Sequence, residues 1–344
     1  LSKSFGDRCV LHDIFAEILV LDKWKNDDRI CTLLDYGLDD ENFWVVMKKY
    51  RTSLGDWRKK QKTKSWNQNL ALYLNIYMEV LQKCRFLSDN NVNHYDIKLD
   101  NFLIEPLDPE ATNDDLYNRA GKTVKCFHPA TDDADVPYFS ISIADFGEAL
   151  VYSDELAGYT TDNRGTEFIK SPEMLNVAYA GRVERQTYDR RRKEGANKAS
   201  DVWSLGCLLY ELLTGEFLFY DHDWVRFRQT VCSPAEELVK QKHREKLREN
   251  QHLIQFLQWI LIRDPAYRPT IADVIQRFTN VQRECLKEIA AKRKAANEKL
   301  DSTASSNRRS KGFGRQGSSG TRMGSEWGAI NSARGDRSKS PDPQ

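Results

Sequence analysis

The stretch His94-Tyr95-Asp96-Ile97-Lys98-Leu99-Asp100-Asn101 decides how the rest of this sequence is interpreted. It lies between an apolar amphipathic run, residues 70–87, and a short apolar segment, residues 102–104, which predicts a loop between a helix and a strand. Asp96, Lys98 and Asn101 combine a carboxylate that can accept a proton, a cation that can meet a phosphate, and an amide oxygen that can bind a metal ion. The alternative is a polar turn that carries Asp and Asn for backbone reasons only, and the stretch alone leaves both interpretations open.

Four further motifs follow in a fixed order. The first, Asp145-Phe146-Gly147, follows an apolar strand pattern, and its acid could reach a metal that bridges nucleotide phosphates. The others are Arg164-Gly165-Thr166 with Ser171-Pro172-Glu173, then Asp201-Val202-Trp203-Ser204-Leu205-Gly206, then Arg263-Asp264-Pro265 with Arg268-Pro269. Together with the first stretch they resemble the eukaryotic protein kinase family over about residues 17–278. The Asp-x-Lys form of the first stretch is similar to the serine/threonine branch of that family.

The resemblance implies an α+β, two-lobed protein-kinase-like fold, with a mainly helical large lobe and a truncated small-lobe sheet. It also implies ATP and Mg²⁺ as ligands. Asp96 would accept the proton of a substrate hydroxyl, and Lys98 would meet the transferring phosphate. Asn101 and Asp145 would hold Mg²⁺ between the ATP phosphates.

Other positions receive supporting roles from the same resemblance. His94 is expected to pack beneath the ring of Phe146, and Glu173 to form a buried ion pair with Arg268. Residues 199–213 are apolar on nearly every side, which predicts a buried helix. Asp201, at its start, would by resemblance hold the backbone of the catalytic loop, although it could equally cap the free N–H groups of the helix. The remaining family positions are the hinge residues Met47 and Lys49, whose backbone would meet the adenine ring, and the regulatory or structural residues Glu17, Gly147 and Thr166.

The N-terminal part has the pattern of one helix and one hairpin. Residues 13–24 carry apolar side chains on one face and predict a helix, which by resemblance is the regulatory helix of the small lobe. Glu17 then corresponds to the glutamate of the family's ion pair with a strand lysine, the alternative being an exposed surface glutamate. Residues 30–34 and 43–47 alternate like two paired strands around turn residues.

The chain begins at Leu1, and we expect it to be a fragment that lacks the front of the small lobe. Lys3 is the available candidate for the strand lysine, but Leu1-Ser2 does not read as the apolar strand that should precede it. A Gly-x-Gly-x-x-Gly pattern at 312–317 lies in a Ser/Arg/Gly-rich segment with no strand before it, so we reject it as a phosphate-binding loop.

Composition predicts a protein of a reducing compartment. The net charge of +1 gives no overall attraction to nucleic acid or membrane. Seven scattered cysteines without a Cys-x-x-Cys pair fit neither a disulfide framework nor a zinc site. No apolar run approaches the roughly 18 residues that span a bilayer. We therefore expect a cytoplasmic or nuclear protein without membrane partners.

The predicted domain organisation has three parts, and the second of them contains two insertions of unusual composition. Residues 1–50 form a partial small lobe with the hinge, residues 51–285 a large lobe, and residues 286–344 a charged helix followed by a disordered Ser/Gly/Arg-rich tail. Within the large lobe, residues 105–138 carry eight acids against three bases, and residues 182–198 carry seven bases against three acids. These two insertions are either solvated loops or docking surfaces for partners.

The interpretation that we carry forward is a serine/threonine protein kinase that phosphorylates a protein hydroxyl. The main alternative is a pseudokinase or scaffold that binds partners without phosphoryl transfer. A kinase acting on small molecules is disfavoured by the Ser-Pro-Glu motif and the complete large lobe.

Overall fold

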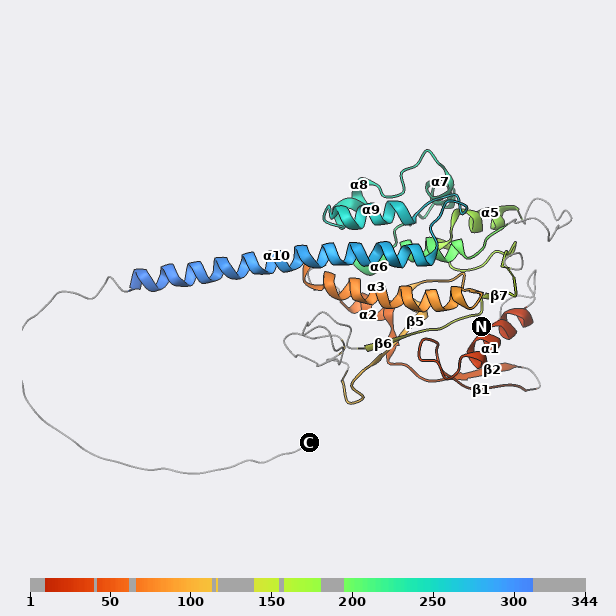
Figure 1. Ribbon diagram of the computed structural model, residues 1–344. Coiled ribbons are helices and arrows are strands. Elements are labelled where there is room, and N and C mark those ends of the chain that lie inside the picture. Colours follow the sequence, from red (N-terminus) through yellow and green to blue (C-terminus); the bar gives the residue numbers. More distant parts are fainter. Residues whose placement is uncertain are drawn as a thin grey trace, which may run out of the picture. The chain divides into compact units, whose positions relative to one another are not determined.

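The computed structural model describes residues 10–39, 42–61, 66–112, 116, 139–154, 158–180 and 195–311 (Figure 1). The chain divides into two compact units, Leu1–Ala291 and Lys292–Gln344. In the described residues, helices predominate and the strands form small antiparallel sheets. The predicted α+β class is therefore confirmed.

Helix α1 (Val10–Lys23) lies against a hairpin formed by β1 (Leu33–Leu38) and β2 (Phe43–Met47) (Figure 1). The helix buries Ala16, Val20 and Leu21 on its inner face. Its outer face and the hairpin leave large apolar side chains in solvent: Phe15 is 58% exposed, Leu34 63% and Leu38 65%. Together these side chains expose more apolar area than the isolated apolar residues that are normal on a protein surface.

The predicted strand at residues 30–34 is wrong at its start. Backbone bonds of this segment go to β6 (Phe139–Ile143) instead of to the hairpin: Cys31 N–H donates to Ile143 O at 2.8 Å, and Ile143 N–H donates to Arg29 O at 2.8 Å. Ile30 therefore forms a single parallel bridge with Ile143, and β1 begins only at Leu33. A local alternation pattern carries no information about so distant a partner.

A three-stranded antiparallel sheet, in the order β3-β5-β6, brings two of the sequence motifs close together. Its strands are β3 (Thr52–Ser53), β5 (Phe102–Pro106) and β6. The strands β5 and β6 flank the acidic insertion and pair from Phe102↔Ile143 to Pro106↔Phe139. This pairing places residues 99–101, before β5, beside residues 144–146, after β6. Residues 113–115 and 117–138 of the insertion lie outside the described residues.

Helix α2 (Leu54–Lys60) follows β3 directly in the chain. The Ser53 hydroxyl caps it by accepting a hydrogen bond from Asp56 N–H at 3.1 Å. Because the cap sits at Ser53, the first turn contains Leu54 and Trp57, which are both fully buried.

The core of the large lobe surrounds α6 (Ala199–Thr214), in which twelve of sixteen residues are buried. It packs against α3 (Trp66–Asp89), where the Tyr77 hydroxyl donates to Leu205 O at 3.0 Å. The ring of Tyr77 also lies 4.7 Å from that of Phe278, on α10 (Ile271–Lys311). The predicted burial of the 199–213 segment is confirmed. The remaining elements are β4 (Val92–Asn93), η1 (Leu99–Asn101), β7 (Leu150–Val151), η2 (Glu167–Ile169), α5 (Pro172–Ala180), α7 (Trp224–Cys232), α8 (Gln241–Lys246) and α9 (Gln251–Ile260).

Helix α10 contains the predicted charged helix at 286–300 and extends it in both directions. The tail at 312–344 lies outside the described residues, as do 182–194 of the basic insertion. None of the described helices combines the length and apolarity needed to cross a membrane.

Candidate functional site

The loop from His94 to Asn101 is held from below by Asp201 of α6. The two carboxylate oxygens of Asp201 accept hydrogen bonds from His94 N–H at 2.8 Å and Tyr95 N–H at 2.7 Å. Two roles were considered for Asp201, and the structure shows the one in which its carboxylate bonds to the backbone of the loop. Such bonds fix the start of the loop on the most deeply buried helix.

Asp96 is 4% exposed, and three neighbours hold its carboxylate. Lys98 Nζ lies 2.6 Å from Oδ2, and Asn101 Nδ2 donates to the same oxygen at 3.2 Å. Oδ1 accepts from Thr166 N–H at 2.8 Å, and Lys98 Nζ also donates to the Thr166 hydroxyl at 2.9 Å. The spacing Asp96, Lys98, Asn101 thus brings all three side chains together, and Thr166 joins them from another segment.

This environment keeps Asp96 ionised near neutral pH. Burial raises the pKa of the carboxyl, but the hydrogen bond and the charge of Lys98 outweigh burial and hold the pKa below its usual range. An ionised carboxylate beside a lysine is suited to orient a hydroxyl group and accept its proton.

Asn101 and Asp145 offer oxygen ligands on one side of this loop. Ala144 N–H donates to Asn101 O at 2.9 Å, which brings the two segments together. Asn101 Nδ2 is used by Asp96, so its amide oxygen remains available, and the exposed Asp145 carboxylate makes no hydrogen bond to the described residues. Carboxylate, amide and water oxygens are what Mg²⁺ prefers, so the residues present fit this ion.

Two residues of the site have left-handed backbone conformations. Tyr95 has φ +60° and Asp145 has φ +66°, which is uncommon for residues other than glycine. His94 lies between them: its ring is 5.1 Å from that of Phe146, and its Nε2 lies 3.1 Å from Ala144 O. Tyr95 directly precedes Asp96, and Asp145 is itself one of the predicted metal ligands, so both conformations occur at the two acids of the site. Backbone strain of this kind clusters at functional sites, where the surrounding structure holds it.

An ion pair between Glu173 and Arg268 joins the start of α5 to the segment between α9 and α10. Arg268 Nη1 lies 2.7 Å from Glu173 Oε1, and Nη2 lies 2.9 Å from Oε2, so the pair is bidentate. Burial raises the pKa of Glu173, but Arg268 outweighs burial and lowers it overall. The ion pair that the resemblance implied is present in this geometry.

The N-terminal candidates are less completely described. Glu17 lies close to the Asp145-Phe146-Gly147 motif, because a Cβ built on Gly147 would be 4.0 Å from Glu17 Oε2. Met47 ends β2 with 37% of its surface exposed, and Lys49 is exposed beyond it. Lys3 lies outside the described residues.

Comparison with known families agrees with these features: a sequence model described as the protein kinase domain matches residues 2–278. The chain belongs to the protein kinase family. It is 49% identical over 280 residues to a probable serine/threonine-protein kinase of Dictyostelium discoideum, an alignment that covers 81% of this chain and 11% of that protein. It is 27% identical over 213 residues to the serine/threonine-protein kinase STY17 of Arabidopsis thaliana, covering 61% of this chain and 28% of the relative. The dual specificity protein kinase TTK of Mus musculus is 23% identical over 263 residues, an alignment that covers 75% of this chain and 25% of the relative. The chain thus spans between about a tenth and about a quarter of the length of these three relatives.

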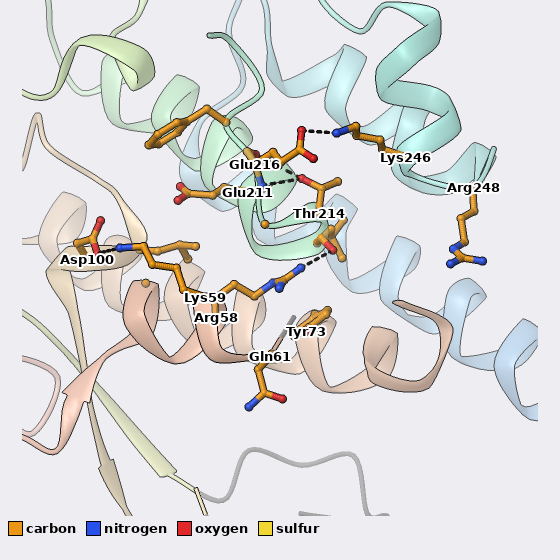
Figure 2. Close-up of a pocket in the computed structure, with 15 residues that line it drawn as sticks. Arg58, Lys59, Gln61, Tyr73, Asp100, Glu211, Thr214, Glu216, Lys246 and Arg248 are labelled. Atoms are coloured by element: carbon orange, nitrogen blue, oxygen red, sulfur yellow. Dashed lines mark hydrogen bonds and ion pairs between the residues drawn. The ribbon is translucent and has the colours of Figure 1, made fainter. Parts of the chain in front are cut away.

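The kinase domain also has a cavity of about 590 Å³ beside the catalytic loop (Figure 2). Asp100 contributes to its wall and lies 3.4 Å from Lys59 Nζ, while Arg58 donates to Leu212 O at 2.6 Å. Burial and the nearby Asp100 raise the pKa of Glu211 to about 7 against the opposing charges of Lys59 and Arg58. Acids and bases alternate around this cavity, so its charge favours no single class of ligand.

Two residues of the kinase site were not given their roles by the sequence. Arg164 was part of a quoted motif, but its guanidinium was not expected to be 3% exposed and bonded to three segments. Tyr95 received no role of its own from the sequence; its buried hydroxyl lies 3.2 Å from Gly158 O and 3.1 Å from Ala196 O. The sequence did contain one signal for the role of Arg164: it is an arginine directly before a Gly-Thr pair, in a segment with few other cations.

Proposed function

We propose that this chain is the catalytic domain of a serine/threonine protein kinase that transfers the γ-phosphate of ATP to a protein hydroxyl. The observation that carries the proposal is the geometry of Asp96, which is ionised, 2.6 Å from Lys98 and bonded to Thr166 and Asn101. The 49% identity to a probable serine/threonine-protein kinase supports the choice of acceptor class.

In the proposed mechanism most of the catalysis comes from positioning and charge. Asp96 orients the acceptor hydroxyl and takes its proton as the oxygen attacks phosphorus. Lys98 neutralises charge on the transferring phosphate, and Thr166 holds Asp96 in line through its backbone N–H. Mg²⁺, when bound at Asn101 and Asp145, supplies positive charge to the phosphates of ATP. The hinge at Met47 and Lys49 would meet the adenine ring.

We also propose that the front of the small lobe belongs to sequence preceding Leu1. Support comes from the apolar side chains that α1 and the hairpin expose, such as Phe15, Leu34 and Leu38, because further strands would cover them. Glu17 would then pair with a lysine from one of those strands or with Lys3. The acidic and basic insertions remain candidate docking surfaces for a protein partner.

The test uses the natural full-length protein and MgATP labelled at the γ-phosphate. We expect label in phosphoserine or phosphothreonine of a generic protein acceptor such as casein or myelin basic protein. Label found only in phosphotyrosine would contradict the serine/threonine assignment. Nucleotide binding without any transfer would favour the pseudokinase or scaffold alternative.

A separate prediction follows from Tyr95, which stands where most relatives of this family carry an arginine. That arginine commonly pairs with a phosphorylated residue of the activation segment (residues 145–173), and a buried tyrosine offers no charge for such a phosphate. We expect phosphatase treatment of the active protein to leave most of its activity, measured as initial rate before and after treatment. A loss of more than tenfold that traces to Ser153, Thr160 or Thr161 would overturn this expectation.

A further inference from the structure

Arg164 is a deeply buried cation of the activation segment. Its side chain is 3% exposed, and its guanidinium contacts three parts of the chain. Nη1 donates to Glu148 O at 3.0 Å, directly after the Asp145-Phe146-Gly147 motif, and Nη2 donates to Asp162 Oδ2 at 2.9 Å within the segment. Nη1 also lies 3.8 Å from Oδ1 of Asp13 in α1, a carboxylate that is 12% exposed.

The backbone immediately after Arg164 contacts the catalytic loop. Gly165 has φ +82°, and a Cβ at this position would lie only 2.1 Å from Tyr95 O, so only glycine allows this approach. One residue later, Thr166 N–H donates to Asp96 Oδ1 at 2.8 Å. Only Gly165 therefore lies between Arg164, whose guanidinium contacts α1, and Thr166, whose N–H holds the proposed base.

Helix α1 carries Glu17 one turn after Asp13, on the same side of the helix. Glu17 lies near Gly147, so α1 contacts the metal-binding motif at one turn and Arg164 at the preceding turn. Any movement of α1 away from the large lobe must separate Asp13 from a buried guanidinium. Such a separation takes from the buried guanidinium one of the two acids beside it, the other being Asp162, and the loss of a counter-charge is costly for a desolvated cation.

Other contacts, charged and neutral, also hold the segment around Arg164. The charged ones include the ion pair of Lys170 with Glu167 at 2.8 Å and the bond from Thr166 N–H to the Asp96 carboxylate. Thr160 and Ala196 exchange two backbone hydrogen bonds at 2.8 and 2.9 Å, and the Tyr95 hydroxyl lies within bonding distance of Gly158 O and Ala196 O. Arg164 Nε adds a longer bond, 3.4 Å, to the Thr160 hydroxyl. Arg164 thus supplies the charged link to α1 from inside the segment.

We propose that Arg164 is a positioning residue that couples helix α1 to Asp96, through Asp13 and Glu148 on one side and the Gly165–Thr166 backbone on the other. The proposal rests on the kinase function proposed above. It adds that the segment needs no phosphate to be tied to α1, because this arginine already provides the connection.

The first arm of the test measures phosphoryl transfer by the full-length protein. Arg164→Met keeps the aliphatic stem and removes the fork, and we expect kcat to fall about 10- to 100-fold through misplacement of Asp96, with KM for MgATP within about threefold of wild type. Arg164→Lys keeps a charge but not the planar fork, and should recover only part of the loss. Asp13→Asn should lower kcat in the same direction, and the double variant Asp13→Asn/Arg164→Met should lose no more than Arg164→Met alone.

The second arm measures amide hydrogen exchange and does not require activity. Arg164→Met and Asp13→Asn should each speed exchange about tenfold or more in both residues 10–23 and residues 158–169, because each substitution breaks the same link. Arg226→Met serves as the matched control, since Arg226 is 76% exposed and pairs only with Asp223 among the described residues. It should leave both kcat and exchange within about twofold of wild type.

The outcomes separate the two proposals. If the wild-type protein transfers no phosphate, the proposed kinase function fails, and the exchange arm still decides the coupling. Faster exchange in only one of the two segments, or in neither, would overturn the coupling. Unchanged kcat in a folded Arg164→Met variant would also overturn it, as would additive losses in the double variant.

Discussion

Replacing Asp96 with Asn is expected to lower kcat about 10²–10⁴-fold, the usual range for loss of a positioned general base. The amide keeps the size of the carboxyl, but it cannot accept the hydroxyl proton and no longer pairs with the charge of Lys98. Nucleotide affinity should change little, because the proposed hinge and Asp145 make no bond to Asp96, and Asn101 can keep its bond to the backbone carbonyl of residue 96 at 2.9 Å. Steady-state kinetics, together with a binding titration of MgATP, would separate the two effects.

The matched control for this substitution is Asp89→Asn. Asp89 is an exposed carboxylate on α3 that pairs with Arg85 at 3.0 Å, so its loss should leave kcat unchanged. A melting curve of each variant would show that it is folded. Near-normal turnover in folded Asp96→Asn would rule out Asp96 as the general base and would direct attention to the pseudokinase alternative for any residual function.

The grouping of three proposed site residues follows from the sequence because they are local in the chain. Asp96, Lys98 and Asn101 fall within six consecutive positions, and in the structure their side chains lie together. The apolar pattern of 199–213 likewise predicted a buried helix, because nearly every side of it is apolar. Such features require no knowledge of distant partners.

The features that the sequence missed depend on long-range pairing. The bridge between Ile30 and Ile143 and the bond from Thr166 to Asp96 each join segments that are far apart in the chain. The role of Arg164 is of the same kind, since its contact with Asp13 exists only once α1 has packed on the large lobe. Local periodicity and composition do not encode which of many arginines meets which acid.

Arg268→Met is expected to destabilise the large lobe by about 3–5 kcal/mol, a large part of the roughly 5–15 kcal/mol that stabilises a typical domain. The side chain of Arg268 is 0% exposed and that of Glu173 is 10% exposed, so the substitution leaves a buried carboxylate without its cation. It also removes donors from Ile262 O and Ala199 O. Urea unfolding at pH 7, followed by tryptophan fluorescence, would measure the loss.

Two controls test whether the ion pair itself is responsible. Lys25→Met removes an exposed pair with Asp22, and should cost less than about 1 kcal/mol. The double variant Glu173→Met/Arg268→Met removes both charges, so it should regain part of the stability. It should not regain all of it, because the carbonyls that Arg268 satisfied remain without donors.

The difference in stability between wild type and Arg268→Met should depend on pH, and this dependence tests the role of charge directly. The pKa of Glu173 is lowered in the folded state, so its contribution to stability is fully present above the unfolded value of about 4.3 and is lost as pH falls through the lower folded value. In Arg268→Met the carboxyl of Glu173 stays buried without its cation, so burial should raise its pKa. Protonation of this carboxyl should then increase the stability of the folded variant. The stability difference between wild type and Arg268→Met should therefore shrink as the pH is lowered from 7 toward 4. A difference that stays constant over this range would mean that packing and backbone hydrogen bonds of Arg268, and not its charge, account for the destabilisation.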